Sequence, residues 1–344
     1  MHRRLRSKRL AGLAATGVAL AVPLSLGVAP VASAAPAPDI KVTQNYSDEI
    51  VPGDGLSCNS GGTDQFVSDN QYLRRFDLNF HNAGGGITIS SVTMGVEIAD
   101  SGDNNVPGSF NVYALDHTAD LTRANLGAPL ASVTVNYSNG TLDTHSVTAP
   151  VTATIPAGKD LVIEAAIDEA TDDEVFFPGA NEAAELGPTF LASEGCGITD
   201  PVTMGDIGFD GLAVVLFAHG KTTACKTAET NAANAATAAA AAAAGVTKAT
   251  GAVDKAKKKL KKAKKSHNPT KIKKAKKKLK KAKKSLKAAQ AAAAAANATL
   301  ATATATQNTT CAQPALPPAP VRPAQGSSQH STGSSNGFSF SARS

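Results

Sequence analysis

The chain has 344 residues, a formal net charge of +6, eleven Phe, four Tyr and no Trp. This length allows one ordinary domain with additional segments, and the scarcity of aromatic residues limits the chain to one modest hydrophobic core. Beyond the N-terminal segment, no apolar run approaches the roughly 20 residues that a membrane-spanning helix needs.

The first 34 residues have the order of a secretory signal peptide. Residues 1–9 hold five basic residues and no acid, residues 10–28 are mostly apolar, and Ala32-Ser33-Ala34 supplies the small residues that a signal peptidase recognises. We therefore expect cleavage after Ala34 and a secreted, extracellular protein that is released or held non-covalently at the cell surface. The alternative is an uncleaved membrane anchor, against which Pro23 and the Ala-Ser-Ala sequence argue.

Residues 35–220 are predicted to form an acidic all-β domain. The stretch 36–220 carries 26 acidic residues against 5 basic ones, a net charge of −21. Short apolar and β-branched runs alternate there with turn sequences such as Gly84-Gly85-Gly86, which favours a two-sheet sandwich that is jelly-roll-like. The expected strands are 76–80, 87–98, 109–115, 131–137, 146–155, 161–167, 174–177, 188–192 and 212–219.

Several short sequences in this half resemble a β-sandwich module that recurs in secreted proteins of actinobacteria and other bacteria. They are residues 68–76 (Ser-Asp-Asn-Gln-Tyr-Leu-Arg-Arg-Phe), 92–97, 111–113, 177–181 and 195–197. The resemblance covers about residues 39–220. It implies an accessory or binding role and no catalysis.

Residues 221–311 are predicted to form a basic helical hairpin. From Lys221 to Thr310 there are 22 lysines and 2 acids, a net charge of +20, and most other residues are strong helix formers. The sequence Lys-Ala-Lys-Lys-Lys-Leu-Lys-Lys-Ala-Lys-Lys-Ser occupies residues 255–266 and again 274–285, and Pro269 interrupts the helix between them. The alternative is a disordered Ala/Lys-rich tract.

A heptad pattern predicts that the two helices pair as an antiparallel coiled coil. Val, Leu and Ile recur at one heptad position and Ala at the other. When the chain is folded at Pro269, residues whose numbers sum to 535 face each other, so that Leu260 meets Ala275 and Val253 meets Ala282. Large side chains then pack against small ones along the whole seam, as an antiparallel coiled coil requires.

The four cysteines are predicted to form two disulfides. An even number of cysteines is typical of an exported chain, and four cysteines allow three pairings. The hairpin register brings Cys225 and Cys311 together at its base, and Cys58 and Cys196 lie near the two ends of the acidic half. We therefore predict the pairs Cys58–Cys196 and Cys225–Cys311.

Near the turn of the hairpin, almost every position outside the seam is a lysine. Lysine is a compact point charge, and without Arg or aromatic residues it favours non-specific attraction to phosphate or sulfate groups. The predicted polyanion-binding residues are Lys257, Lys258, Lys261, Lys262, Lys264, Lys265, Lys273, Lys276, Lys277, Lys280, Lys281 and Lys284. The tract resembles the Lys/Ala-rich tails of linker-histone-like proteins and the mycobacterial heparin-binding haemagglutinin.

Several partners and roles follow from this charge. Anionic polymers such as teichoic acid, sulfated glycans and DNA, or an anionic membrane surface, are the expected partners, and the acidic and basic halves could also associate with each other. We expect the lysine-rich end to fray in low salt and to become ordered on a polyanion, because like charges at i,i+4 destabilise a helix. The alternative is a solvated spacer.

No catalytic motif is found in the sequence. There is no Gly-x-Ser-x-Gly, no His-Glu-x-x-His and no phosphate loop, so we expect no catalytic residue, no metal ligand and no cofactor. The acidic loops 100–104 and 168–174 offer oxygen ligands for Ca²⁺, although solvated surface turns are the simpler interpretation. Residues 312–344, rich in Pro and then in Ser and Gly, are predicted to be a disordered tail.

Together these features predict a secreted, non-catalytic binding protein of the cell envelope or extracellular space, in which the hairpin binds polyanions. One alternative is a sandwich that binds carbohydrate or protein and is displayed on a helical spacer. A second alternative is a secreted hydrolase.

Overall fold

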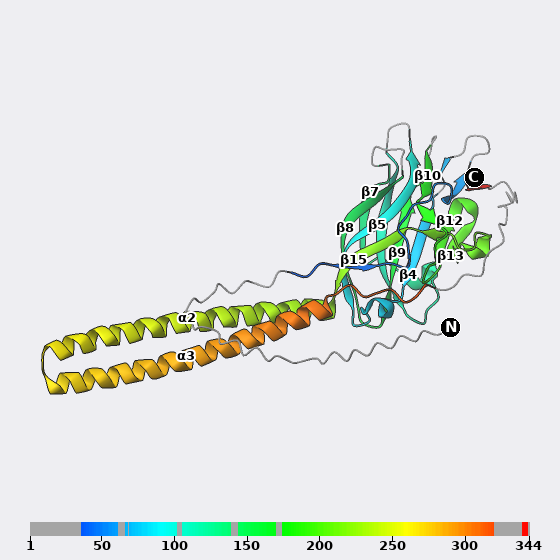
Figure 1. Cartoon of the computed structure of the whole chain (residues 1–344). Coiled ribbons are helices and arrows are strands. Elements are labelled where there is room, and N and C mark those ends of the chain that lie inside the picture. Colours follow the sequence, from blue (N-terminus) through cyan, green and yellow to red (C-terminus); the bar gives the residue numbers. More distant parts are fainter. Residues whose placement is uncertain are drawn as a thin grey trace, which may run out of the picture.

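The computed structural model describes residues 36–60, 66–67, 69–101, 105–138, 144–169, 174–319 and 339–342. A body of β-strands carries two long helices that project from it as a narrow rod (Figure 1). The expected signal peptide, residues 1–34, lies outside the described residues.

Two antiparallel sheets form the body. In the first sheet the strand order is β1-β15-β5-β10, with β8 also paired to β5, and in the second it is β13-β12-β4-β9-β6-β7. The first sheet contains β1 (Ile40–Val42), β5 (Ile87–Asp100), β8 (His145–Ile155), β10 (Val175–Pro178) and β15 (Leu216–Thr222). The second contains β4 (Gln71–Phe76), β6 (Pro107–Asp116), β7 (Ala131–Asn136), β9 (Lys159–Ile167), β12 (Thr189–Ser193) and β13 (Ile198–Thr203).

Smaller elements complete the body. Two small antiparallel sheets have the orders β11-β14 and β16-β2-β3. Their strands are β2 (Leu56–Ser60), β3 (Phe66–Val67), β11 (Ala180–Asn181), β14 (Ala213–Val214) and β16 (Ser339–Ala342). The short helices are η1 (Leu78–His81), α1 (Arg123–Leu126), η2 (Glu194–Cys196) and η3 (Gly205–Ile207).

One hydrophobic core lies between the two large sheets. Its cluster of buried side chains contains Ile87 and Ile89 of the first sheet together with Phe110, Val112 and Ile163 of the second. Along β8, buried and exposed residues alternate over most of the strand, as expected for a strand with one face on a core. The sheets therefore face each other as a β-sandwich.

The outer face of the second sheet is covered at one end by a loop. Residues 117–130, which include α1, bring Leu121 and Leu126 onto Leu73, Tyr113 and Val162 to form a second, smaller buried cluster. Because successive side chains of a strand point to opposite faces, Tyr72 and Phe76 enter the main core while Leu73 belongs to the outer cluster. Arg75, two residues beyond Leu73, therefore also lies on the outer face.

The observed strands differ from the predicted ones in several places. The expected strand 76–80 is the end of β4 followed by η1, because the Asp77 side chain accepts a hydrogen bond from the Asn79 amide and caps this helical turn. The expected strand 212–219 is divided between β14 and β15. Most of β4 was also missed, and strands β1, β2, β3, β11, β13 and β16 were not predicted, because most of them are short or, like residues 198–203, contain Asp and Pro.

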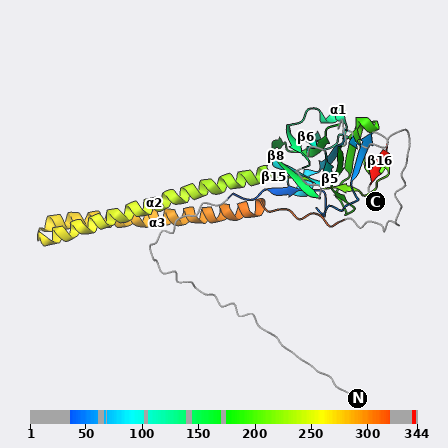
Figure 2. The same ribbon diagram turned by 90° about the horizontal axis from the view of Figure 1, so that it is seen from above.

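The predicted hairpin is formed by α2 (Thr223–Lys265) and α3 (Pro269–Thr310), which run alongside each other in both views (Figures 1 and 2). Asn268 is the N-cap of α3, its side chain accepting from the Lys271 amide at 3.1 Å, and Pro269 occupies the first helical position. The predicted seam lies on the buried side, with Val246, Val253 and Ala275 buried. Leu260 and Ile272, and the α3 seam residues Leu286 and Leu300 further from the turn, are only half-buried.

Both predicted disulfides are formed, Cys58–Cys196 within the sandwich and Cys225–Cys311 at the base of the hairpin, where the two Cα atoms are 4.8 Å apart. The boundary between the halves lies two residues later than predicted, because β15 continues to Thr222. Thr222 then caps α2 by accepting a hydrogen bond from the Cys225 amide at 3.0 Å. The strand therefore passes into the helix without a linker.

Part of the expected disordered tail is ordered against the sandwich. The Gln313 side chain pairs with both backbone groups of Lys41, accepting at 2.6 Å and donating at 3.0 Å, and thereby covers the edge strand β1. The Tyr46 hydroxyl donates to the Pro317 carbonyl oxygen at 2.6 Å. Further on, β16 pairs with β2. Residues 312–319 and 339–342 of the predicted tail thus include contacts with the sandwich, and residues 320–338 lie outside the described chain.

Candidate functional site

The far end of the hairpin carries the predicted lysines. We call the twelve residues named above as polyanion-binding the lysine tip. All twelve are exposed. Within the described chain only one of them has an acidic partner, Lys257, whose Nζ is 3.3 Å from Asp254 Oδ1. The structure therefore gathers almost unneutralised positive charge at the end of the rod.

The N-terminus of α3, at the turn, adds to this positive potential. The first turn of α3 contains no acidic residue, although its free N–H groups carry a partial positive charge that acids normally offset. The last turn of α2 contains Lys262, Lys264 and Lys265, which are well placed near the negative end of that helix. The unbalanced charge is thus greatest on α3, where an incoming anion would meet both lysines and the helix N-terminus.

The base of the rod is fixed to the sandwich by several contacts besides the disulfide. The Thr223 amide donates to the Gly86 carbonyl oxygen at 2.9 Å, and Lys226 Nζ donates to Thr88 Oγ1 at 3.0 Å. Glu229 accepts from the Ala37 amide at 2.7 Å and forms an ion pair with Lys221 at 2.8 Å. These contacts hold α2 on both β5 and the N-terminal segment, so the rod has a fixed direction.

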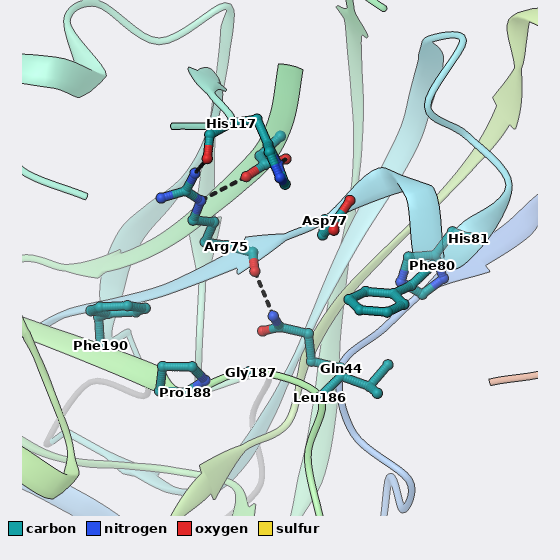
Figure 3. Close-up of a pocket in the computed structure, with 11 residues that line it drawn as sticks. Gln44, Arg75, Asp77, Phe80, His81, His117, Leu186, Gly187, Pro188 and Phe190 are labelled. Carbon is teal, nitrogen blue, oxygen red and sulfur yellow. Dashed lines mark hydrogen bonds and ion pairs between the residues drawn. The ribbon is translucent and has the colours of Figure 1, made fainter. Parts of the chain in front are cut away.

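A second candidate site is a cavity of about 290 Å³ on the outer face of the sandwich, which sequence reasoning missed. It lies where β4 ends and β9 begins, which is also the end of the sheets from which the hairpin emerges. Figure 3 shows Phe80 on one side and Phe190 with Pro188 on the other, with Arg75 and Gln44 between them. Its lining residues are Gln44, Arg75, Asp77, Phe80, His81, His117, Asp160, Leu186, Gly187, Pro188 and Phe190.

Asp160 holds together the charged side of this cavity. Its Oδ2 accepts from Arg75 Nε at 2.7 Å, and its Oδ1 is 2.9 Å from His117 Nδ1. The other Arg75 nitrogens donate to backbone carbonyls, Nη1 to Ala119 at 2.6 Å and Nη2 to His117 at 2.6 Å. The register of the sheet, in which Asp116 lies opposite Lys159, places His117 beside Asp160.

Two histidines of the cavity have shifted pKa values. The hydrogen bond to Asp160 raises the pKa of His117 above its ordinary value, because the carboxylate stabilises the imidazolium. Burial lowers the pKa of His81 to about 4, because its charged form would lose solvation. His81 is therefore neutral at physiological pH.

The carboxylates and imidazole of this cavity invite comparison with a metal site. Ligand atoms of Asp77, His117 and Asp160 lie within 4.8 Å of one another. Arg75, however, already neutralises Asp160 and would repel a cation placed there. Among the lining residues that the structure describes, none carries a hydroxyl or thiol nucleophile. The arrangement is thus better suited to hydrogen bonding than to metal binding.

The acidic loops considered for Ca²⁺ are only partly visible. Residues 102–104 and 170–173 lie outside the described residues, so the possible Ca²⁺ ligands of these loops stay a prediction. The cavity residues themselves gave a weak signal in the sequence. Asp116-His117 and Asp160 stand at strand ends, and they would be recognised as neighbours only if β6 and β9 were known to pair.

Comparison with protein-family models, with curated proteins and with solved structures found no match for this chain. Among the described residues, no helix is both long and apolar enough to cross a membrane. All four cysteines lie in the described chain and all are paired. Any functional conclusion therefore depends on the chemistry of the two sites.

Proposed function

We propose that this protein is a secreted, non-catalytic binding protein of the cell envelope or extracellular space, and that its lysine tip binds polyanions. The observation that carries the proposal is the set of twelve exposed lysines at the far end of a rod, of which only Lys257 has an acidic partner in the described chain. The two disulfides and the secretory pattern of residues 1–34 support an oxidising, extracellular location.

The length of the rod keeps the lysine tip away from the acidic sandwich. Helix α2 has 43 residues, which at 1.5 Å per residue gives a rod of about 65 Å. Charges separated by more than the Debye length of about 8 Å at physiological salt are largely screened. The −21 charge of the sandwich half therefore does not neutralise the tip in the same molecule.

The kind of charge indicates the kind of ligand. Lysine attracts phosphate and sulfate as a point charge, whereas base-specific recognition relies on bidentate arginines and stacking aromatics. The lysine tip contains neither. Teichoic acid, sulfated glycans, DNA and anionic membrane surfaces are thus the proposed partners, bound through their repeated negative charges.

The test is a salt series with the oxidised full-length mature chain and heparin, duplex DNA or teichoic acid. We expect the logarithm of the binding constant to fall linearly with the logarithm of the salt concentration. Changing the six α2 lysines of the tip to Gln should make this slope shallower by as much as about five units on DNA. Changing the same six to Arg is the matched control and should leave the slope unchanged, because the charge is kept.

The result that would contradict the proposal is a chain that binds none of the three polymers at low salt. Binding with a slope that the Gln variant does not alter would contradict it as well, because the contacts would then lie elsewhere. In either case the hairpin would be a spacer.

A second candidate function is self-association of the acidic and basic halves. Because the base of the rod is fixed, the tip cannot fold back onto the sandwich of its own molecule. Attraction between the two halves would therefore act between neighbouring molecules. Sedimentation velocity at low and high salt tests it. Oligomers that dissociate as salt is added would support it, and a monomer at all salt concentrations would contradict it.

We also infer that the sandwich is of the jelly-roll type. Counting β1, β4, β5, β6, β7, β8, β9 and β15 as strands one to eight, the sheets have the orders 1-8-3-6 and 2-7-4-5. The chain thus passes between the sheets as in two Greek keys, with β10 beside β5 and with β12 and β13 as additional strands. Sandwiches of this kind serve many functions, so the fold supports an accessory module without naming its ligand.

A further inference from the structure

The cavity beside Arg75 has one exposed aromatic wall. Phe80 is 48% exposed, and among the described residues only Leu130 is another large hydrophobic side chain exposed to this degree. The turn that carries Phe80 is held on both sides, by the Asp77 cap and by Asn82, whose amide donates to the Asn79 carbonyl oxygen at 3.1 Å. A ring that is fixed and exposed at the edge of a cavity is available to pack against an apolar ligand surface.

Most of the polar groups in the cavity are already bonded within the protein. Both oxygens of Asp160 are used by Arg75 and His117. Gln44 donates to the Arg75 carbonyl oxygen and accepts from Arg74 at 3.3 Å. These residues are therefore positioning groups, which fix the shape of the cavity.

Nδ1 of His81 has no partner among the described residues, but His81 is buried, so two accessible groups remain for a ligand. Asp77 uses Oδ1 for the Asn79 amide and side chain, and no described residue bonds to its Oδ2. His117 uses Nδ1 for Asp160, which leaves Nε2 without a partner in the described chain. A ligand atom of each of these two residues lies within 4.8 Å of one from the other, so the two side chains border the same space. Adjacent hydroxyls of one ligand ring could therefore reach them, one donating to the Asp77 carboxylate and the other bonding His117.

The charge of the cavity excludes the ligand proposed for the lysine tip. Arg75 is offset by Asp160, which leaves the carboxylate of Asp77 and the imidazole of His117. The cavity thus has no excess positive charge, and an anionic polymer has no reason to prefer it. Its volume of about 290 Å³ is at the lower end of small-molecule sites, which suits one ring of a ligand.

We propose that this cavity binds a single neutral pyranose ring of a saccharide. The C–H face of the ring packs on Phe80, and adjacent hydroxyls bond Asp77 and His117. The inference does not rest on the polyanion-binding role of the lysine tip. The two sites take ligands of different chemistry and lie at opposite ends of the rod.

The experiment is an NMR titration of the full-length mature chain with neutral methyl pyranosides of glucose, galactose, mannose, xylose and N-acetylglucosamine. We expect saturable shifts of backbone amides at residues 75–81 and 117 with at least one of them. Glucuronate, of similar shape but negatively charged, should bind more weakly.

Two variants and one control test the assignment of the contacts. Asp77→Asn keeps the helix cap, because Asn is as good an N-cap as Asp, and removes the charged acceptor. Phe80→Ala removes the exposed ring. Each should weaken binding at least about tenfold, as expected for a lost charged hydrogen bond or aromatic contact. Leu130→Ala, which removes the other exposed hydrophobic side chain, is the matched control and should leave binding unchanged.

Three results would overturn the proposal. The first is the absence of saturable shifts with every neutral pyranoside up to tens of millimolar. The second is binding that Asp77→Asn and Phe80→Ala leave unaltered in folded protein, as judged by an unchanged spectrum elsewhere. The third is binding of choline without binding of any pyranoside, which would make the cavity a cation site.

Discussion

Removal of the Cys225–Cys311 disulfide should melt the hairpin while leaving the sandwich folded. The bridge closes a loop of 86 residues that consists almost entirely of α2 and α3. The entropy of closing a loop of this size corresponds to about 4 to 5 kcal/mol at 25 °C in the chain-entropy model. Packing of the seam offers little to compensate for this loss, because the seam is mostly Ala and, on α3, Ala275 is its only buried apolar residue.

The two helices should respond differently. Helix α2 continues directly from β15 and keeps its contacts with Gly86 and Thr88. The C-terminal end of α3 is held by the disulfide and by the segment of Gln313 and Pro317 that follows it. In the variant C225S/C311S we therefore expect α3 to separate first.

Far-UV circular dichroism at 222 nm during heating, at low salt, measures this. C225S/C311S should lose its helical signal at a clearly lower temperature than the wild type. The control is C58S/C196S, which opens a loop of 138 residues in the sandwich. It should lower the transition seen by tyrosine fluorescence and spare the helical one. Equal helical midpoints for C225S/C311S and the wild type would refute the reasoning, because the seam alone would then hold the hairpin.

Three further predictions follow from the sandwich and the tip. Glu185→Gln should lower the free energy of unfolding, measured with urea, by about 3 to 5 kcal/mol. The reason is that the fully buried Arg74 loses the carboxylate that lies 2.8 Å from its Nη2, and a change below about 1 kcal/mol would contradict this. Because the pKa of His81 is about 4 in the folded state, the unfolded state binds more protons between pH 6.5 and pH 4. As the pH is lowered through this range, the free energy of unfolding of the wild type should fall by about 3 kcal/mol more than that of His81→Gln. Parallel plots of unfolding free energy against pH for the two proteins would contradict this. The helical circular dichroism signal of the chain should increase with added salt or heparin, because screening relieves the repulsion between lysines at i,i+4 in the lysine tip. A signal that depends on neither would show that packing of the seam already outweighs this repulsion.

The hairpin could be predicted almost completely because its determinants are local. The heptad spacing and the turn at Pro269 are set by residues close together in the sequence. Once the turn fixes the register of the two helices, the pairing of Cys225 with Cys311 follows from it. The bridge at the expected base supports that register. The sandwich was predicted as a class, because alternation and turn residues indicate strands but not their neighbours.

The cavity could not be predicted because its residues meet only through the sheet. Arg75 is on β4, Asp160 on β9 and His117 just after β6, and they become neighbours because both β4 and β6 pair with β9. The sequence also suggested that Phe80 ended a strand. The Asp77 cap instead turns the chain into η1 and places Phe80 in solvent, so a local hydrogen bond decided a feature that apolar patterning had misassigned.

The strand-to-helix junction explains why the two sites can act independently. A flexible linker would let the +20 hairpin approach the −21 sandwich, and the two halves would neutralise each other. Here β15 runs into α2, and the disulfide and the bonds of Thr223 and Lys226 fix its direction. The separation of about 65 Å then greatly exceeds the screening length, so the positive charge of the tip is available only to another molecule. The same contacts keep the cavity at the base of the rod while the tip is at its far end, so a protein with both proposed activities would connect a neutral glycan to an anionic polymer.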